Sequence, residues 1–260
     1  MTSTDDTLIL DSVARFLERD VKPHVRELED RDTYPHEIVA KMRELGLFGA
    51  TIAPEYGGLG LSTATYARIV EQVSGVWMSV SGIFNSHLIM AAAVERFGSD
   101  EQKNHYLPRF ASGELRGGIA LTEPGGGTDL QAITTQAKHD GNGYVIDGTK
   151  TWITNSIEGQ ILAVLVKTDP AAEPRHKGMS LLLVEKGDGV EVGQKLKKMG
   201  YRGIDTGELH FNECHVPADA LIGPEEGHGL QQILAGLALG RINVAARGLG
   251  IARASLEQAT

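Results

Sequence analysis

The hydrophobic pattern of this chain changes its period twice, and this change constrains the fold more than any other feature. Apolar residues recur at helical spacing to about residue 117, at strand spacing to about residue 221, and at helical spacing again from Gly229. A chain of 260 residues is long enough for more than one core. The pattern predicts an α+β multidomain protein with an N-terminal α-helical domain (1–117), a middle β-barrel domain (118–224) and a long final helix (225–260).

Residue types mark the helix boundaries in the first part of the chain. A stripe of apolar residues at four-residue steps opens it: Val13, Leu17, Val21 and Val25. Pro35 lies near the start of a second helix, and Gly46 interrupts the far end of that helix. A long apolar helix then ends at Gly98, and Ser99 is the expected N-cap of the next helix.

Turn residues divide the middle part into short strands. The segment Asp140-Gly141-Asn142-Gly143 predicts a hairpin turn between strands at 134–139 and 144–147. Two apolar runs, 161–166 and 180–184, predict buried strands. The spacing favours seven or eight strands, and a barrel is the expected arrangement.

Charge and cysteine content restrict the partners. The formal net charge is −9 and no basic stripe occurs, which argues against a nucleic-acid partner. The single cysteine, Cys214, excludes an internal disulfide and is interpreted as a small buried strand residue in a reducing compartment. The histidines nearest to it, His210 and His215, point to opposite faces of a strand, so no metal site is expected.

The N-terminus gives no targeting signal. Residues 1–6 are acidic and polar, without the apolar stretch of a secretory signal or the arginines of a transit peptide. No run of 18 apolar residues occurs, so no membrane span or membrane partner is expected. The expected location is the cytoplasm.

Two neighbouring segments have the composition of a binding site for a large planar ligand. The turn Leu121-Thr122-Glu123-Pro124-Gly125-Gly126-Gly127-Thr128-Asp129 combines hydroxyls with three glycines that leave the backbone open to a ligand. The strand-like segment Lys150-Thr151-Trp152-Ile153-Thr154-Asn155 places Trp152 and Thr154 on one face. An aromatic wall, hydroxyls and open backbone together suit a planar heterocycle with a phosphate tail.

These segments, with several others in the same order, resemble the acyl-CoA dehydrogenase family of flavoproteins. The other segments that carry the resemblance are Ala53-Pro54-Glu55-Tyr56-Gly57-Gly58-Leu59-Gly60, Phe97-Gly98-Ser99-Asp100-Glu101-Gln102, Tyr106-Leu107-Pro108, Lys198-Met199-Gly200-Tyr201-Arg202, Val216-Pro217 and Gly240-Arg241-Ile242. Their order and spacing across essentially the whole chain are specific, because they fall in unrelated kinds of local structure.

The resemblance implies that residues 225–260 are the first helix of a C-terminal helical bundle. It also implies FAD as cofactor and assigns residues to it. The implied flavin-binding residues are Ile119, Leu121, Thr122, Gly127, Thr128, Trp152, Ile153 and Thr154. Among them, Trp152 would pack beside the ring and Thr154 would hydrogen-bond near flavin N5. Thr128 would face both the pyrophosphate and the acyl-CoA, and Arg241 would lie at the substrate mouth. From periodicity alone, Arg241 is equally consistent with a structural ion pair or a surface charge.

The proton acceptor of such an enzyme is not found in this sequence. The family removes an α proton with a Glu, which lies in the C-terminal helical domain or, in a minority, directly before the arginine of the last motif. That position is Gly240 here, and no Asp or Glu occurs between Gly229 and Ser255. We therefore expect that the chain is a fragment of a longer enzyme with its base beyond Thr260. The alternatives are a base from another chain or a protein without this activity. Glu123 precedes Pro124 and is expected to stabilise the turn.

Two glycine motifs are rejected as nucleotide sites. The segment from Gly143 to Thr151 resembles a P-loop, but Thr149 separates Gly148 from Lys150 and a strand follows. Gly248-Leu249-Gly250 lies inside a helix, where small residues let another helix approach closely.

The leading functional hypothesis is an FAD-dependent acyl-CoA dehydrogenase of fatty-acid β-oxidation. Its implied partners are an acyl-CoA substrate, an electron-transferring flavoprotein and further copies of the chain, as a homotetramer or a dimer. An acyl-CoA oxidase or flavin monooxygenase on the same fold is a second hypothesis, and a non-catalytic partner subunit that holds flavin or acyl-CoA is a third.

Overall fold

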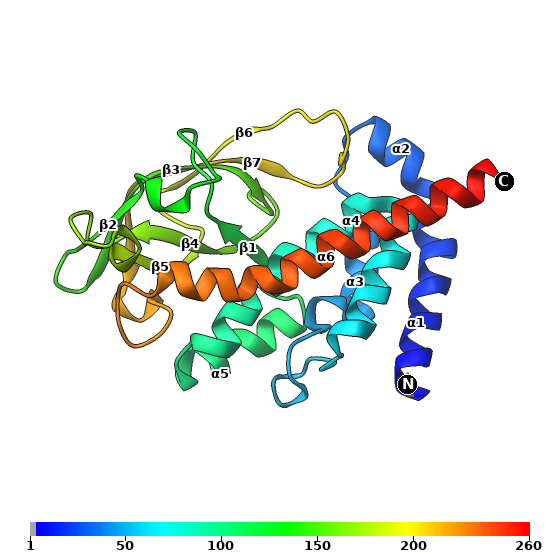
Figure 1. Cartoon of the computed structure of the whole chain (residues 1–260), viewed down its shortest axis with the longest axis horizontal. Helices are drawn as coiled ribbons and strands as arrows, with labels where there is room; N and C mark the ends of the chain where they lie inside the picture. Colours follow the sequence, from blue (N-terminus) through cyan, green and yellow to red (C-terminus); the bar gives the residue numbers. More distant parts are fainter. Residues whose placement is uncertain (1–3) are drawn as a thin grey trace.

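The computed structural model describes residues 4–260 and shows a helical part, a curled sheet and a long final helix that crosses the helical part (Figure 1). The helices are α1 (Thr4–Phe16), α2 (Val25–Asp30), α3 (His36–Glu44), α4 (Thr63–Phe97), α5 (Asp100–Ala111) and α6 (Gly229–Ala259). The strands are β1 (Gly117–Ala120), β2 (Gln136–His139), β3 (Gly143–Thr154), β4 (Ile161–Lys167), β5 (Met179–Glu185), β6 (Val190–Lys195) and β7 (Thr206–Pro217). The two predicted changes of period are therefore confirmed.

The first apolar stripe is confirmed, but its backbone is not a single α-helix. Val13, Leu17 and Val21 are buried. The α-helix ends at Phe16, a π-helical turn covers Leu17–Val21, and a 3₁₀ turn covers Lys22–His24. Pro23 lies in this last turn and has no N–H to donate, which disfavours a regular α-helix at this point.

Capping residues define the end of α4 and the start of α5. α4 ends at Phe97 with Gly98 at its C-cap. The Ser99 hydroxyl accepts from the Gln102 backbone N–H, and the Gln102 side chain accepts from the Ser99 N–H, which forms a complete capping box at the start of α5. The predicted helix boundary is confirmed.

Helices α4 and α6 pack against each other over much of their length. A Cβ on Gly250 would lie 2.2 Å from the Glu71 carbonyl oxygen, and one on Gly236 would lie 3.0 Å from the Ile89 carbonyl oxygen. The two helices run antiparallel, since residue 236 meets residue 89 and residue 250 meets residue 71. The interpretation of Gly248-Leu249-Gly250 as a close-approach segment is confirmed at Gly250 and is wrong at Gly248, where an added Cβ would meet nothing within 4 Å. By length and composition α4 could cross a membrane, yet 78% of its most apolar stretch is buried inside the protein.

The seven strands form one mixed sheet in the order β1-β4-β2-β3-β7-β6, with β5 on β4. The predicted hairpin is present as the antiparallel pair β2–β3. The sheet curls into a half-barrel that stays open, because β6 pairs only with β7 among the described residues.

Strand β4 separates two cores, which explains its unbroken apolar sequence. Ile161, Ala163 and Leu165 belong to the core shared with the helices. Leu162, Val164 and Val166 belong to the core inside the curled sheet. Buried Cys214 packs in this second core, as predicted. A strand covered on both faces reads as a continuous apolar run.

Candidate active site

A cavity of about 590 Å³ lies where the helical part meets the sheet. Its walls come from α4, α6, the end of β1, the end of β3 and the loop before β7. Seven of the predicted site residues line it: Ile119, Leu121, Thr122, Trp152, Ile153, Thr154 and Arg241. The fold therefore brings together residues that lie more than a hundred positions apart in the sequence.

The glycine turn stands at the edge of this cavity. Gly127 and Thr128 are not among its lining residues, and their roles stay predictions. An added Cβ would meet nothing within 4 Å at Gly125 or Gly126, so the backbone there is open. A Cβ at Gly127 would lie 2.9 Å from the Thr122 methyl carbon. This glycine lets the turn fold back against a lining residue.

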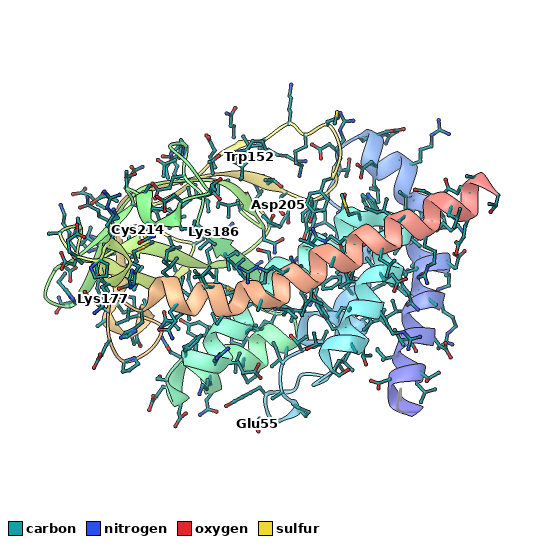
Figure 2. All side chains as sticks on the ribbon, viewed as in Figure 1. Glu55, Trp152, Lys177, Lys186, Asp205 and Cys214 are labelled. Carbon is teal, nitrogen blue, oxygen red and sulfur yellow. The ribbon has the colours of Figure 1, made fainter. Side chains whose placement is uncertain are left out.

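Trp152 has an unusual backbone for its position. Its φ is 60°, and the pairing of β3 with β7 shifts register between Lys150 and Ile153. Trp152 and Thr154 both line the cavity, as alternation predicts, but the bulge rather than a regular strand orients the indole. Trp152 is 57% exposed, which is high for a large aromatic residue in a strand. Its place on the sheet is labelled in Figure 2. A strained, exposed indole at a cavity wall is typical of a ligand contact.

A buried ion pair supports the glycine turn from inside. Lys150 Nζ lies 2.9 Å from Glu123 Oε1 and donates to the Leu121 carbonyl oxygen at 3.0 Å. Glu123 also accepts from the backbone N–H groups of Thr134 and Thr135. Burial alone would raise the pKa of Glu123, but Lys150 and these donors lower it to about 2. Glu123 is thus an ionised structural residue, as the sequence predicts, and its oxygens are already occupied.

Asn155 fixes the end of β3 next to the cavity. Its Nδ2 donates to the carbonyl oxygens of Ile83 at 3.0 Å and Gly117 at 2.6 Å. These contacts tie Asn155, the residue after Thr154, to both α4 and β1. On the α4 side, the Ser86 hydroxyl accepts from the Ile119 N–H at 3.3 Å. The backbone next to Thr154 is therefore held at the cavity wall by two neighbouring elements.

Apart from Arg241, the sequence-based interpretation missed the helical wall of the cavity. Asn85 and Arg247 line it, and Tyr201 comes from a family motif to which no role was given. The Tyr201 hydroxyl packs so closely on Gly82 that an added Cβ there would lie 1.7 Å from it. The available signal was the periodicity of α6, because 237, 240, 244 and 247 recur at helical spacing on one face.

No carboxylate lines the cavity among residues 4–260. Position 240, directly before Arg241, is glycine, and a Cβ there would lie 2.9 Å from the Ile89 Cδ1 atom. The charged groups at the cavity are the two arginines, Arg241 and Arg247. The described part of the chain therefore offers binding and positioning groups and no proton acceptor there.

The helical part and the half-barrel have the architecture of the acyl-CoA dehydrogenase N-terminal and middle domains. The family model of the acyl-CoA dehydrogenase N-terminal domain matches residues 3–114, and the model of the middle domain matches residues 118–214. The chain belongs to the acyl-CoA dehydrogenase family.

Three relatives illustrate the match. The human mitochondrial short-chain specific acyl-CoA dehydrogenase is 36% identical over 257 residues, covering 96% of this chain and 60% of that protein. A structure from work on the electron-transferring flavoprotein of Acidaminococcus fermentans has a TM-score of 0.94 at 35% identity, covering 98% of this chain and 67% of the other. A glutaryl-CoA dehydrogenase from Mycobacterium smegmatis in complex with FADH2 has a TM-score of 0.89 at 29% identity, covering 98% and 64%. The chain spans 47% to 65% of the length of the curated relatives it matches.

Proposed function

We propose that this chain forms the flavin-binding and acyl-CoA-binding part of an FAD-dependent acyl-CoA dehydrogenase. The reaction removes hydrogen from Cα and Cβ of an acyl-CoA thioester and gives the 2-enoyl-CoA. The observation that carries the proposal is the wall formed by Thr122, Trp152 and Thr154, which meets α6 at Arg241 around one cavity.

The residues present fit a flavin. A planar ring needs a flat apolar surface and hydrogen-bonding groups at its edge, which the exposed Trp152 indole and the Thr122 and Thr154 hydroxyls supply. The open backbone at Gly125 and Gly126 has room for a phosphate-bearing tail. When bound, the flavin supplies a hydride acceptor.

The chain's own residues bind and orient in this reaction. Thr154 lines the cavity, and the Asn155 contacts hold the adjoining backbone in place. Lys150 holds the Leu121 carbonyl, which keeps the neighbouring backbone in place. Arg241 is exposed on α6 beside the cavity and is suited to attract the anionic CoA moiety.

The α proton requires a carboxylate that the described residues do not place at the cavity. In the proposed enzyme this base comes from a part of the protein outside residues 4–260 or from another chain. The absence of a lining carboxylate within this range also favours a second candidate, a non-catalytic subunit that binds flavin or acyl-CoA for a partner.

Anaerobic mixing of the full-length, FAD-loaded protein with a panel of acyl-CoA thioesters tests the proposal. A dehydrogenase bleaches its flavin and needs an added acceptor to turn over. Direct peroxide formation in air would indicate an oxidase instead, and binding without bleaching would indicate the partner subunit. Transfer to an electron-transferring flavoprotein is proposed as the next step, in line with the Acidaminococcus structure. A role in β-oxidation, a cytoplasmic location and a homotetrameric or dimeric state belong to the same proposal.

A further inference from the structure

Arg247 presents two unused hydrogen-bond donors at the cavity. Its Nε and Nη2 atoms are buried and have no hydrogen-bond partner among the described residues. Arg247 also has no ion pair in this range, although its guanidinium lies 5.3 Å from the centre of the Tyr201 ring and next to the hydroxyl of that residue. Buried guanidinium nitrogens without an acceptor are costly, so an arrangement of this kind points to a missing anionic partner.

The two free nitrogens have the geometry of a carboxylate receptor. Nε and Nη2 lie on the same edge of the planar guanidinium and carry parallel N–H groups, which fit the two oxygens of one carboxylate. No acidic residue lines the cavity within residues 4–260, so this part of the protein provides no competing acceptor there. The Oδ1 atom of Asn85, which also lines the cavity, is buried without a partner, and an amide can turn either its oxygen or its nitrogen to a ligand.

Arg247 lies at the end of the cavity away from the proposed flavin wall. Thr154 and Ile119 approach α4 near Ser86, since a Cβ on Gly118 would lie 3.0 Å from the Thr154 carbonyl and Ile119 N–H donates to Ser86. The next turn of α4 toward its N-terminus carries Gly82, which contacts Tyr201.

Helix α6, on the other side of the cavity, also places Arg247 away from the flavin wall. Gly240 packs on Ile89, and Arg247 follows seven residues later, about 10 Å along a helix axis. A group bound between α4 and α6 could therefore touch the flavin wall at one end and Arg247 at the other.

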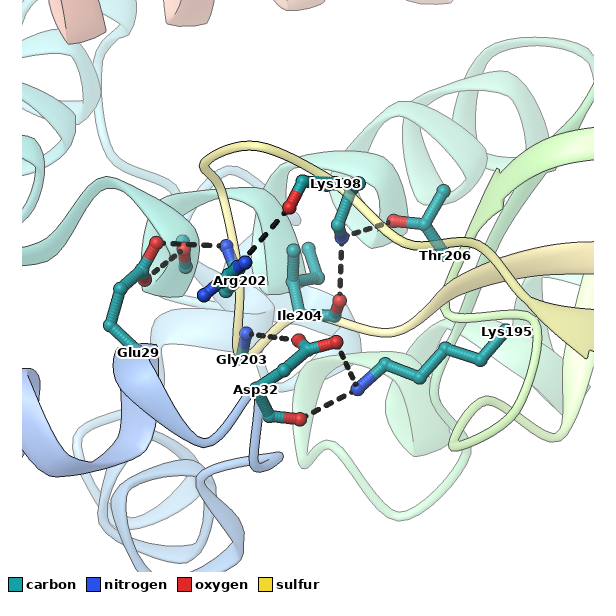
Figure 3. Close-up of polar contacts among 9 residues, drawn as sticks. Glu29, Asp32, Lys195, Lys198, Arg202, Gly203, Ile204 and Thr206 are labelled. Atoms are coloured by element: carbon teal, nitrogen blue, oxygen red, sulfur yellow. Dashed lines mark hydrogen bonds and ion pairs between the residues drawn. The ribbon is translucent and has the colours of Figure 1, made fainter.

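Residues 196–205 between β6 and β7 form the Tyr201 loop, which borders Arg247. Hydrogen bonds hold this loop to the helical part and to β7 (Figure 3). Arg202 N–H donates to Glu29 Oε1 at 3.0 Å, and Gly203 N–H donates to Asp32 Oδ1 at 2.9 Å. Lys198 Nζ donates to the Ile204 carbonyl and to the Thr206 hydroxyl, both at 2.8 Å. With Tyr201 held in this way and packed on Gly82, the Arg247 edge is pre-organised rather than free to swing to solvent.

We propose that this site accepts an acyl-CoA whose acyl group ends in a carboxylate, and that Arg247 binds this carboxylate through Nε and Nη2. The proposal rests on the proposed function, because it assigns the far end of the acyl group in the same cavity. Arg247 is then a specificity-determining residue.

The test compares two thioesters of equal chain length, glutaryl-CoA and pentanoyl-CoA, on the full-length FAD-loaded protein. Equilibrium dissociation constants are read from the change in the flavin spectrum or by calorimetry, and flavin reduction is followed anaerobically. We expect the wild type to bind glutaryl-CoA at least about tenfold more tightly, as a bidentate charged contact would give. Arg247→Met should remove this preference by weakening glutaryl-CoA binding and leaving pentanoyl-CoA binding unchanged or tighter. Arg26→Met, at an arginine whose side chain is 96% exposed on α2, is the matched control.

The outcomes separate this inference from the function on which it rests. Flavin reduction by both thioesters without a carboxylate preference would support the dehydrogenase and overturn the role of Arg247. Preferential binding of glutaryl-CoA without flavin reduction would support Arg247 and overturn the dehydrogenase. If Arg247→Met weakens both thioesters equally, or only lowers stability, Arg247 is a structural residue and the inference is wrong. Should Arg247→Met fail to fold, Arg247→Lys keeps the charge and loses the planar fork, and an unchanged preference in that variant would overturn the bidentate contact.

Discussion

Lys150 Nζ and Glu123 Oε1 lie 2.9 Å apart in a pair whose side chains are almost wholly buried. The pair joins the glycine turn to β3, and the same ammonium holds the Leu121 carbonyl at the cavity wall. It thus links the stability of the fold to the shape of the proposed flavin site.

Glu123→Gln should destabilise the protein by about 3–5 kcal/mol, because the variant leaves the Lys150 ammonium buried without a counter-charge. Urea unfolding at pH 7 measures this, with Glu27→Gln at an exposed ion pair as the control. The double variant Glu123→Gln/Lys150→Met should recover a large part of the loss. If the single and the double variant are equally unstable, the unpaired charge is not the cause.

The same pair has a defined pH dependence. The folded pKa of Glu123 is about 2, below the value of about 4.3 for an unfolded Glu. Its contribution to stability is therefore fully present above about pH 4.3 and is lost as the pH falls through the folded pKa. The difference in unfolding free energy between wild type and Glu123→Gln should shrink over this range, and a constant difference would contradict the assignment.

His87 should make the protein less stable in mild acid. The ring is fully buried; Nε2 donates to the Phe110 carbonyl, and Nδ1 accepts from the Gly117 N–H. Burial, which favours the neutral ring, lowers the pKa of His87 to about 4. Below about pH 6.5 the unfolded chain binds a proton that the folded one does not, so stability is lost as the pH falls from 6.5 to 4.

The loss from this residue should reach about 3 kcal/mol near pH 4. Chemical unfolding of wild type and His87→Gln from pH 7 to 4 isolates it, since the variant cannot titrate there. His24→Gln, at an exposed position, should follow the wild type. Parallel pH curves for wild type and His87→Gln would show that His87 is not the titrating group.

Trp152→Ala should lower the FAD content of the purified protein, because it removes the flat wall of the cavity. Trp152→Phe keeps a flat ring and should retain most of the FAD. Thr154→Ala should instead shift the flavin potential or slow its reduction by an acyl-CoA, since a hydrogen bond of this kind is worth about 1 kcal/mol. Normal FAD content in Trp152→Ala together with normal reduction in Thr154→Ala would remove the flavin assignment from this cavity.

The features that could be predicted from the sequence are those set by local chemistry. Ser99 caps a helix because its hydroxyl reaches a backbone N–H three residues on, and Asp140 to Gly143 form a turn because those residue types favour it. Alternation correctly placed Trp152 and Thr154 at one cavity. Neither the positive φ of Trp152 nor the open edge of the sheet follows from such patterns, since both depend on how β3 pairs with β7 and where β6 stops pairing.

The missed part of the site depends on distant packing. Arg247 is one of several arginines on α6 in the sequence, and it is distinguished only when α6 packs on α4 and the Tyr201 loop closes over Gly82. The segment Gly248-Leu249-Gly250 was expected to let another helix approach, but the sequence did not show that only Gly250 faces α4. The two glycines can therefore be compared directly.

Gly248→Ala and Gly250→Ala should have opposite effects on stability. Both glycines lie in α6, but a Cβ on Gly248 would meet nothing within 4 Å, whereas one on Gly250 would lie 2.2 Å from the Glu71 carbonyl oxygen. Gly248→Ala should stabilise the protein by up to about 1 kcal/mol through helix propensity alone. Gly250→Ala gains the same propensity, but it must push α6 away from α4, and overpacking of this kind costs about 1–3 kcal/mol. Thermal and urea unfolding of the two variants measure the difference directly. Two equally stable variants would mean that α6 does not pack on α4 through Gly250.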